Sequence, residues 1–210
     1  MTRKFLALTG LPLLALLALL GACASTTPAP SLYQLRAAPP EAVAAAAAVA
    51  AAAAVGPVAG TQVLQLLLPV TLPEVLERDA LVVAQGQAGV QALPGHRWAE
   101  PLREAVPRLL RQDLALLLGE ARVWAAPVPA GVVITRQLRV EVLLLQTVAD
   151  RSAVALQARW TLSDPLGRTP PLVQTTQLNV PTTGTTPEHW VTAHRLALWR
   201  LAEQVAQTSR

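Results

Sequence analysis

Cysteine is almost absent from this sequence. Cys23 is the only one among 210 residues, so no disulfide can form within the chain. Charged residues are also scarce, at 14% against 52% hydrophobic residues, which argues against an intrinsically disordered chain. Lysine does not occur after Lys4, and the 15 arginines beyond Cys23 are spread along the chain among 13 acidic residues. A nucleic-acid interface needs several cations on one face, so the pI near 10.5 does not predict a nucleic-acid partner.

Candidates for catalysis are few as well. None of the five serines lies in the G-x-S-x-G pattern of a nucleophile elbow, and no glycine-rich phosphate loop is present. The three histidines lack the spacing of zinc ligands, and His194 is predicted to lie at the edge of the core. Glu74, Glu77 and Asp79 cluster near Arg78, but solvated loop charges explain them more simply than a shared acid–base site. We therefore predict that the protein is not an enzyme and holds neither a metal nor a cofactor.

The first 22 residues have the layout of an export signal. Two basic residues precede an apolar run over 5–20, which is shorter than the roughly 20 residues that a membrane-spanning helix needs. The run ends in Leu20-Gly21-Ala22-Cys23, which resembles the bacterial lipobox. The resemblance implies cleavage between Ala22 and Cys23, then acylation of the Cys23 thiol and of the new amine, which would anchor the chain in a membrane. The alternative is an ordinary signal peptide in which the cysteine has no role.

A low-complexity stretch separates the expected anchor from the expected folded domain. Residues 24–30 are small, polar and proline-containing, which predicts a flexible tether. Residues 42–55 are almost entirely alanine and valine, and alanine favours a helix, but these side chains have little area to bury. We therefore expect three parts: a lipoprotein signal peptide over 1–22, the lipidated cysteine with its tether and the alanine-rich segment over 23–60, and the folded domain over 61–208.

Alternation of apolar and polar residues predicts most of the strands. It is clearest over 137–148 and 154–162, and in the first of these Val140, Val142 and Leu144 are expected to share one face. Shorter strands are expected at 31–35, 62–70, 81–85, 90–93, 121–125 and 172–180.

Two segments have the spacing of amphipathic helices. In the first, over 98–118, Glu104 and Arg108 lie four residues apart and are expected to pair. The second follows a capping box formed by Thr185 and Glu188. The order of strands, helix, strands and helix predicts a single α+β domain with an antiparallel or mixed β-sheet and two helices packed on one face.

Several segments occur in an order that resembles a known family. They are the lipobox, Tyr33-x-Leu35, Leu72–Arg78, Leu81–Val83, Trp98–Leu102 with Leu109, Leu110 and Leu114 behind it, Ala158–Asp164 and Leu201–Ala206. Together they resemble the ABC-type transport auxiliary lipoproteins, the PqiC/YmbA family. The most specific part is the Trp98–Leu102 motif with its spacing from Arg78. Arg78, Trp98, Glu100, Pro101 and Leu102 are therefore the candidate family-motif or partner-docking residues.

The resemblance implies a non-catalytic role in transport. Such lipoproteins accompany ABC transporters with MCE-domain (Mce-type) proteins, which move lipids between the inner and outer membranes. The implied location is the periplasmic face of the outer membrane, since Ala24 rather than aspartate follows the acylated Cys23. The implied partners are a periplasmic MCE-domain protein, outer-membrane lipid through Cys23, and further copies of the chain in a homo-oligomer. Two alternatives remain: a regulatory lipoprotein that contacts a cell-wall synthase, and, less favoured, a periplasmic hydrolase.

Overall fold

The described part of the chain is residues 29–36 and 62–209 of a computed structural model, and it has the predicted order of strands, helix, strands and helix. Its elements are β1 (Ser31–Tyr33), β2 (Leu64–Leu66), the 3-10 turn η1 (Glu74–Leu76), β3 (Ala80–Gln85), β4 (Gly89–Trp98), α3 (Leu102–Leu118), the 3-10 turn η2 (Glu120–Arg122), β5 (Val123–Ala125), β6 (Arg136–Thr147), β7 (Ala153–Ser163), β8 (Leu172–Pro181) and α4 (Pro187–Thr208). The expected signal peptide, Cys23, the alanine-rich segment and all but the last two residues of the expected tether lie outside the described residues.

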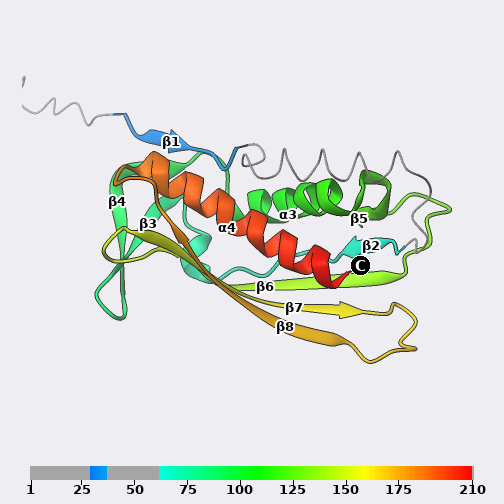
Figure 1. The fold of residues 1–210 in the computed structure, drawn as a ribbon. Coiled ribbons are helices and arrows are strands. Elements are labelled where there is room, and N and C mark those ends of the chain that lie inside the picture. The colour runs from blue at the N-terminus through cyan, green and yellow to red at the C-terminus, as the bar shows by residue number, and fades with distance from the viewer. Residues whose placement is uncertain (1–28, 37–61, 210) are drawn as a thin grey trace, which may run out of the picture. The chain divides into compact units, whose positions relative to one another are not determined.

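The strands form one mixed sheet of eight, with β6 joining its parts (Figure 1). On one side β6 pairs antiparallel with β7, and β7 with β8. On its other side β6 runs parallel to β2 beside Leu138 and to β3 beside Thr147. Between β2 and β3 the chain stays beside β6, because Thr71 hydrogen-bonds with the backbone of Val140 and Val142. The sheet continues from β2 to β5 and from β3 through β4 to β1, so it includes a strand that precedes residue 61.

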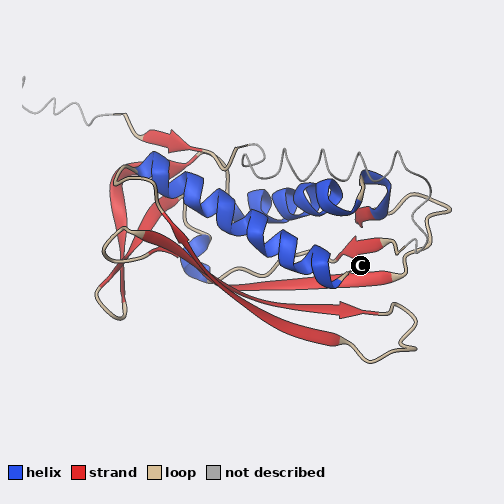
Figure 2. Ribbon diagram, in the orientation of Figure 1, coloured by secondary structure: helices blue, strands red, loops and turns tan. Residues whose placement is uncertain are grey.

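Both helices cover the same face of the sheet, as Figure 2 shows, which confirms the predicted fold class. The long apolar stripe of α4 turns inward onto β6, β7 and β8, and its residues Trp190 and Trp199 are fully buried. Helix α3 packs beside α4 and buries Leu109, Leu110 and Leu114. The core therefore lies between one sheet face and two neighbouring helices, where the apolar side of each element is removed from water.

The alternation predicted for β7 is confirmed, whereas the face predicted for β6 is wrong in its second half. The register between β6 and β7 shifts between Val142 and Leu144. An extra residue in a strand moves every following side chain to the other face. Leu145 and Thr147 are therefore buried, and Leu144 is only half-buried.

The first helix starts later than its apolar spacing predicts. Residue Trp98 is the last of β4, since its N–H donates to the backbone oxygen of Asp79, and α3 begins at Leu102. Pro101 stands immediately before the helix and its carbonyl oxygen accepts the first helical hydrogen bonds. The helix ends, as predicted, at Gly119, whose φ of 105° is a conformation that glycine adopts without a steric penalty.

Two expected side-chain pairs do not form. Arg108 bonds to Glu100, which lies before α3, and not to Glu104 four residues earlier in the helix. The N-cap of α4 is Thr186 and not Thr185, and its hydroxyl hydrogen-bonds with Nδ1 of His189. In both cases a residue that precedes the helix, Glu100 or Thr186, is the partner of a helix residue, and helix spacing alone does not predict this.

Candidate docking site

The Trp98–Leu102 motif lies where β1, β4 and α3 meet. The N–H of Ala99 donates to the carbonyl oxygen of Tyr33 at 2.7 Å, which ties the motif to β1. Trp98 and Leu102 are buried, and the Trp98 ring meets the His194 ring edge-on with centroids 5.6 Å apart. The apolar residues of the motif therefore anchor it in the core and leave the Glu100 carboxylate between them at the surface.

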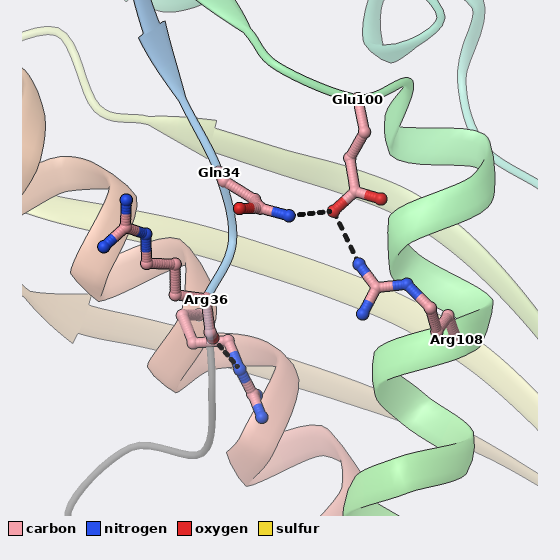
Figure 3. Close-up of polar contacts among 5 residues, drawn as sticks. Gln34, Arg36, Glu100 and Arg108 are labelled. Carbon is pink, nitrogen blue, oxygen red and sulfur yellow. Dashed lines mark hydrogen bonds and ion pairs between the residues drawn. The ribbon is translucent and has the colours of Figure 1, made fainter.

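Glu100 is the centre of a small polar cluster, which Figure 3 shows. Its Oε1 accepts a hydrogen bond from the Arg108 guanidinium at 2.5 Å and a longer one from the Gln34 side chain at 3.5 Å. These groups come from the residue before Pro101, from α3 and from the end of β1. A carboxylate just before a helix also interacts favourably with the positive end of the helix dipole. The cluster thus links the incoming N-terminal strand to the first helix at the surface.

Arg78 lies apart from this cluster. It is exposed between η1 and β3, and among the described residues none forms a hydrogen bond or ion pair with its guanidinium. Its neighbour Asp79 pairs instead with Arg97 at 2.9 Å, with both side chains largely exposed. The structure therefore brings Trp98, Glu100, Pro101 and Leu102 together and leaves the fifth predicted residue outside.

A groove of about 720 Å³ runs beside the cluster, between the end of β1 and the outward side of α3. Its lining residues are Gln34, Leu35, Arg36, Arg108, Leu109, Arg111, Gln112, Asp113, Leu116, Glu120 and Arg195. Four of these are arginines and two are acidic. Arg111 lies 3.3 Å from Glu120 at the rim, whereas the Arg36 side chain is exposed and forms no hydrogen bond or ion pair with any residue of the described ranges. The lining therefore combines leucine side chains with charged ones, and arginines outnumber acidic residues in it.

A buried ion pair closes the inner end of this groove. The guanidinium of Arg195 donates two hydrogen bonds to the two carboxylate oxygens of Asp113, at 2.8 and 2.5 Å. Its Nε donates a third to the backbone oxygen of Arg36 at 3.0 Å, which is one of the dashed contacts in Figure 3. The side chains are 6% and 0% exposed. One arginine thus joins α3, α4 and the segment that leaves β1.

Burial of Asp113 opposes its negative charge, and Arg195 offsets only part of this effect, so the pKa of the carboxyl stays above its ordinary value. Burial raises the pKa of the Asp113 carboxyl, while the hydrogen bonds and the positive charge of Arg195 act in the opposite direction. Neither residue was singled out by sequence reasoning, although a signal existed. Asp113 interrupts the apolar stripe between Leu110 and Leu114, and Arg195 directly follows His194 on an apolar helix. An acid and a base in two facing apolar stripes indicate a buried pair.

His194 lies deeper than the core edge where the sequence placed it. It is 3% exposed, and its Nδ1 donates a hydrogen bond to the backbone oxygen of Trp190 at 2.8 Å. Burial lowers the pKa of His194 to about 4, because a charged imidazolium would lose its hydration there. The ring is therefore neutral at physiological pH and supports Trp98 of the motif by packing.

Residues 29–36 and 62–209 contain neither a cluster of metal ligands nor a helix suited to cross a membrane. Within these ranges no group of three or more histidine, cysteine or acidic side chains is arranged to hold a metal ion. No helix of the same ranges combines the length and the hydropathy that a membrane span requires.

Comparison with known proteins identifies the family. Residues 33–206 match the model of the family described as ABC-type transport auxiliary lipoprotein component. A solved structure described as an uncharacterized protein has a TM-score of 0.65 at 17% identity and covers 86% of this chain and 99% of its own. A DUF330 protein from Xanthomonas campestris has a TM-score of 0.59 at 16% identity, with 85% and 95% covered. No match was found among curated protein sequences.

The two solved structures share the α+β fold with this chain, and their low identity limits the likeness to the fold. The family match spans both the sheet and the two helices, from the last residue of β1 to the last turn of α4. The chain therefore belongs to the ABC-type transport auxiliary lipoprotein component family.

Proposed function

We propose that the protein is a non-catalytic lipoprotein anchored to the periplasmic face of the outer membrane, where it serves an Mce-type ABC transport system that moves lipid between the inner and outer membranes. The observation that carries the proposal is the family match over residues 33–206. In this proposal acylated Cys23 supplies the anchor, the folded domain supplies the docking surface, and copies of the chain associate with one another.

The docking surface in this proposal is the groove beside the Glu100 cluster. Its excess of arginine suits an acidic or polar segment of the MCE-domain partner, and Arg36 at its rim is exposed. The walls of the groove come mainly from residues 34–36, just after β1, and from α3, which the buried Asp113–Arg195 pair and the Arg36 backbone contact connect. A rigid, charged groove favours fast and selective docking of a segment of opposite charge.

The test is affinity purification of the full lipoprotein from cross-linked envelopes, with the co-purified proteins identified by mass spectrometry. The informative variant reverses two groove charges, Arg36→Glu with Arg108→Glu. The matched control reverses two arginines on the sheet face away from the helices, Arg139→Glu with Arg159→Glu, since both are exposed there. We expect the wild-type and control proteins to recover an MCE-domain protein with its permease and ATPase, and the groove variant to recover much less.

Each other outcome changes a different part of the proposal. Equal recovery by both variants would move the docking surface away from the groove and leave the transport role intact. Recovery of a cell-wall synthase without any MCE-domain protein would replace the transport role with the regulatory one.

A further inference from the structure

The outer edge of β8 is the longest open strand edge in the described part of the chain. All ten residues of β8 pair with β7 in one unbroken register, and no described strand pairs with β8 on its other side. The backbone N–H and C=O groups that point away from β7 are therefore available to another strand. By contrast, the terminal strands at the other ends of the sheet, β1 and β5, have three residues each.

This edge lacks the features that usually prevent strand pairing between molecules. Natural edge strands are protected by charged side chains, proline or bulges. β8 contains no charged residue and no bulge, and its only proline, Pro181, is its last residue. The open edge of β4 in the same sheet is protected in just this way: it contains Pro94, then Gly95 with a φ of 73°, and its register with β3 is irregular between Ala80 and Val82.

Apolar side chains are exposed at the start of the same strand. Leu172 is 41% exposed and Val173 is 55% exposed. Leu166, in the turn between β7 and β8, is 72% exposed. An uncharged strand edge that continues into exposed leucine and valine is more typical of a protein–protein contact than of a solvated edge.

We propose that β8 pairs antiparallel with β8 of a second copy of this chain, about a two-fold axis perpendicular to the sheet. This inference rests on the self-association included in the proposed function and names its surface. Three observations favour a second copy as the occupant. An uncharged strand meets no like charge when it pairs with itself. Among the described strands, its ten-residue edge finds an equal unprotected length only in another β8, since β1 and β5 would match three residues and the open edge of β4 contains Pro94. A two-fold axis closes the contact, so no open edge remains along β8.

The geometry of such a pair defines which residues meet. Directly opposite residues of antiparallel strands lie on the same face of a sheet, so the helices of both copies would cover the same side of a continuous sheet. Residues Val173, Thr175, Gln177 and Asn179 are exposed on the face away from the helices, whereas Thr176 is buried against them. A residue close to the axis lies opposite its own copy, with Cβ atoms about 4.5–5.5 Å apart, close to the span of a disulfide.

The experiment uses single cysteine substitutions in the full-length lipoprotein, oxidised in intact envelopes and resolved on non-reducing gels. The substitutions are Val173→Cys, Thr175→Cys, Gln177→Cys and Asn179→Cys. The matched control is Arg159→Cys, which lies on the same exposed face one strand further in, opposite Thr175. Its counterpart in the proposed pair is three strand spacings away, about 14 Å, which is beyond disulfide reach. The unsubstituted chain shows whether Cys23 contributes any dimer.

We expect at least one β8 cysteine to give roughly ten times more covalent dimer than the Arg159→Cys control, with a maximum at the one position on the axis or at the two positions that flank it. A second variant, Thr175→Lys with Gln177→Lys, should abolish the non-covalent dimer seen by native mass spectrometry in detergent. Both side chains are exposed in the single chain, so the variant should still fold.

Three results would overturn the proposal: no β8 cysteine exceeds the control, the lysine variant retains its oligomer, or the β8 cysteines cross-link to a different protein. If either of the first two results is found while an oligomer is still present, the chain self-associates through a surface other than β8. Recovery of the MCE partner is measured separately. Covalent β8 dimers without that partner would leave this inference standing while the transport role fails.

Discussion

The buried ion pair between Asp113 and Arg195 offers the sharpest test of the structure. Replacing Arg195 by methionine preserves much of the side-chain volume but leaves the Asp113 carboxylate, which is 0% exposed, without its cation. Breaking a buried pair in this way costs about 3–5 kcal/mol, since the remaining charge has lost its water without compensation. A domain of ordinary stability has about 5–15 kcal/mol in total, so Arg195→Met is expected to remove a large part of the free energy of unfolding.

The assay is urea unfolding followed by tryptophan fluorescence, because Trp160, Trp190 and Trp199 are all buried. The control is Arg159→Met, whose arginine is exposed and lies 3.8 Å from Glu141, and whose effect should stay within about 0.5 kcal/mol. The double variant Asp113→Leu with Arg195→Met removes both charges. It should recover most of the stability lost in the single variant, since a buried pair replaced by apolar residues is often neutral or stabilising.

The same pair predicts a dependence on pH. Without Arg195, burial and the negative charge of Glu203 act on Asp113 unopposed and raise its pKa further. An acid whose pKa is raised on folding binds more protons when folded, so the penalty of the Arg195→Met variant relative to wild type should shrink as the pH falls toward the ordinary value of 3.8. A loss below about 1 kcal/mol at neutral pH, or a penalty independent of pH, would show that the pair is not desolvated and would refute this reasoning.

Three further predictions follow from single residues. Burial lowers the pKa of His194 from 6.5 to about 4, so the contribution of the neutral ring to stability is complete above pH 6.5 and is lost as the pH falls from 6.5 to 4, by about 3 kcal/mol near pH 4. His194→Asn keeps a donor for the same backbone oxygen and should flatten this part of the stability curve measured by urea unfolding. An unchanged slope would contradict the assignment of the pH dependence to His194. Thr176→Val removes the buried hydroxyl that accepts a hydrogen bond from Trp160 at 3.0 Å and should lower the free energy of unfolding by about 1–3 kcal/mol. Thr175→Val on the exposed face should change it very little. Equal melting temperatures of the two variants would count against the Trp160–Thr176 hydrogen bond. Cys23→Ser should abolish labelling of the protein by radioactive palmitate, and persistent labelling would exclude Cys23 as the acylated residue.

The parts of the fold that sequence reasoning predicted well depend on local periodicity. The alternation over 154–162 predicted β7 because a half-buried antiparallel strand must place every second side chain in the core. The apolar stripe of α4 and the end of α3 at Gly119 were predicted for the same kind of reason, since helical spacing and a glycine's backbone freedom are properties of the chain itself. The export signal and Cys23 are also read from consecutive residues, and they stay predictions because they lie outside the described residues.

The parts that were missed depend on neighbours distant in sequence. Trp98 has helical spacing to Leu102, yet backbone bonds to Asp79 keep it in β4. The bulge after Val142 reverses the face of the following residues because β7 determines the register. Two acidic residues, Glu100 and Glu104, lie within eight positions before Arg108, and only the packing of the chain before α3 brings Glu100 to the guanidinium.

The candidate site divides in the same way. The sequence by itself determined that Trp98, Glu100, Pro101 and Leu102 form one motif, because these residues are consecutive or nearly so, and it determined the α+β order of elements. Only the tertiary structure decided that Arg78 stays outside, that Asp113 meets Arg195 across 82 positions of sequence, and that β8 is left as an open edge. Pairing across such separations is governed by which surfaces exclude water together, and that is a property of the folded chain rather than of any local segment.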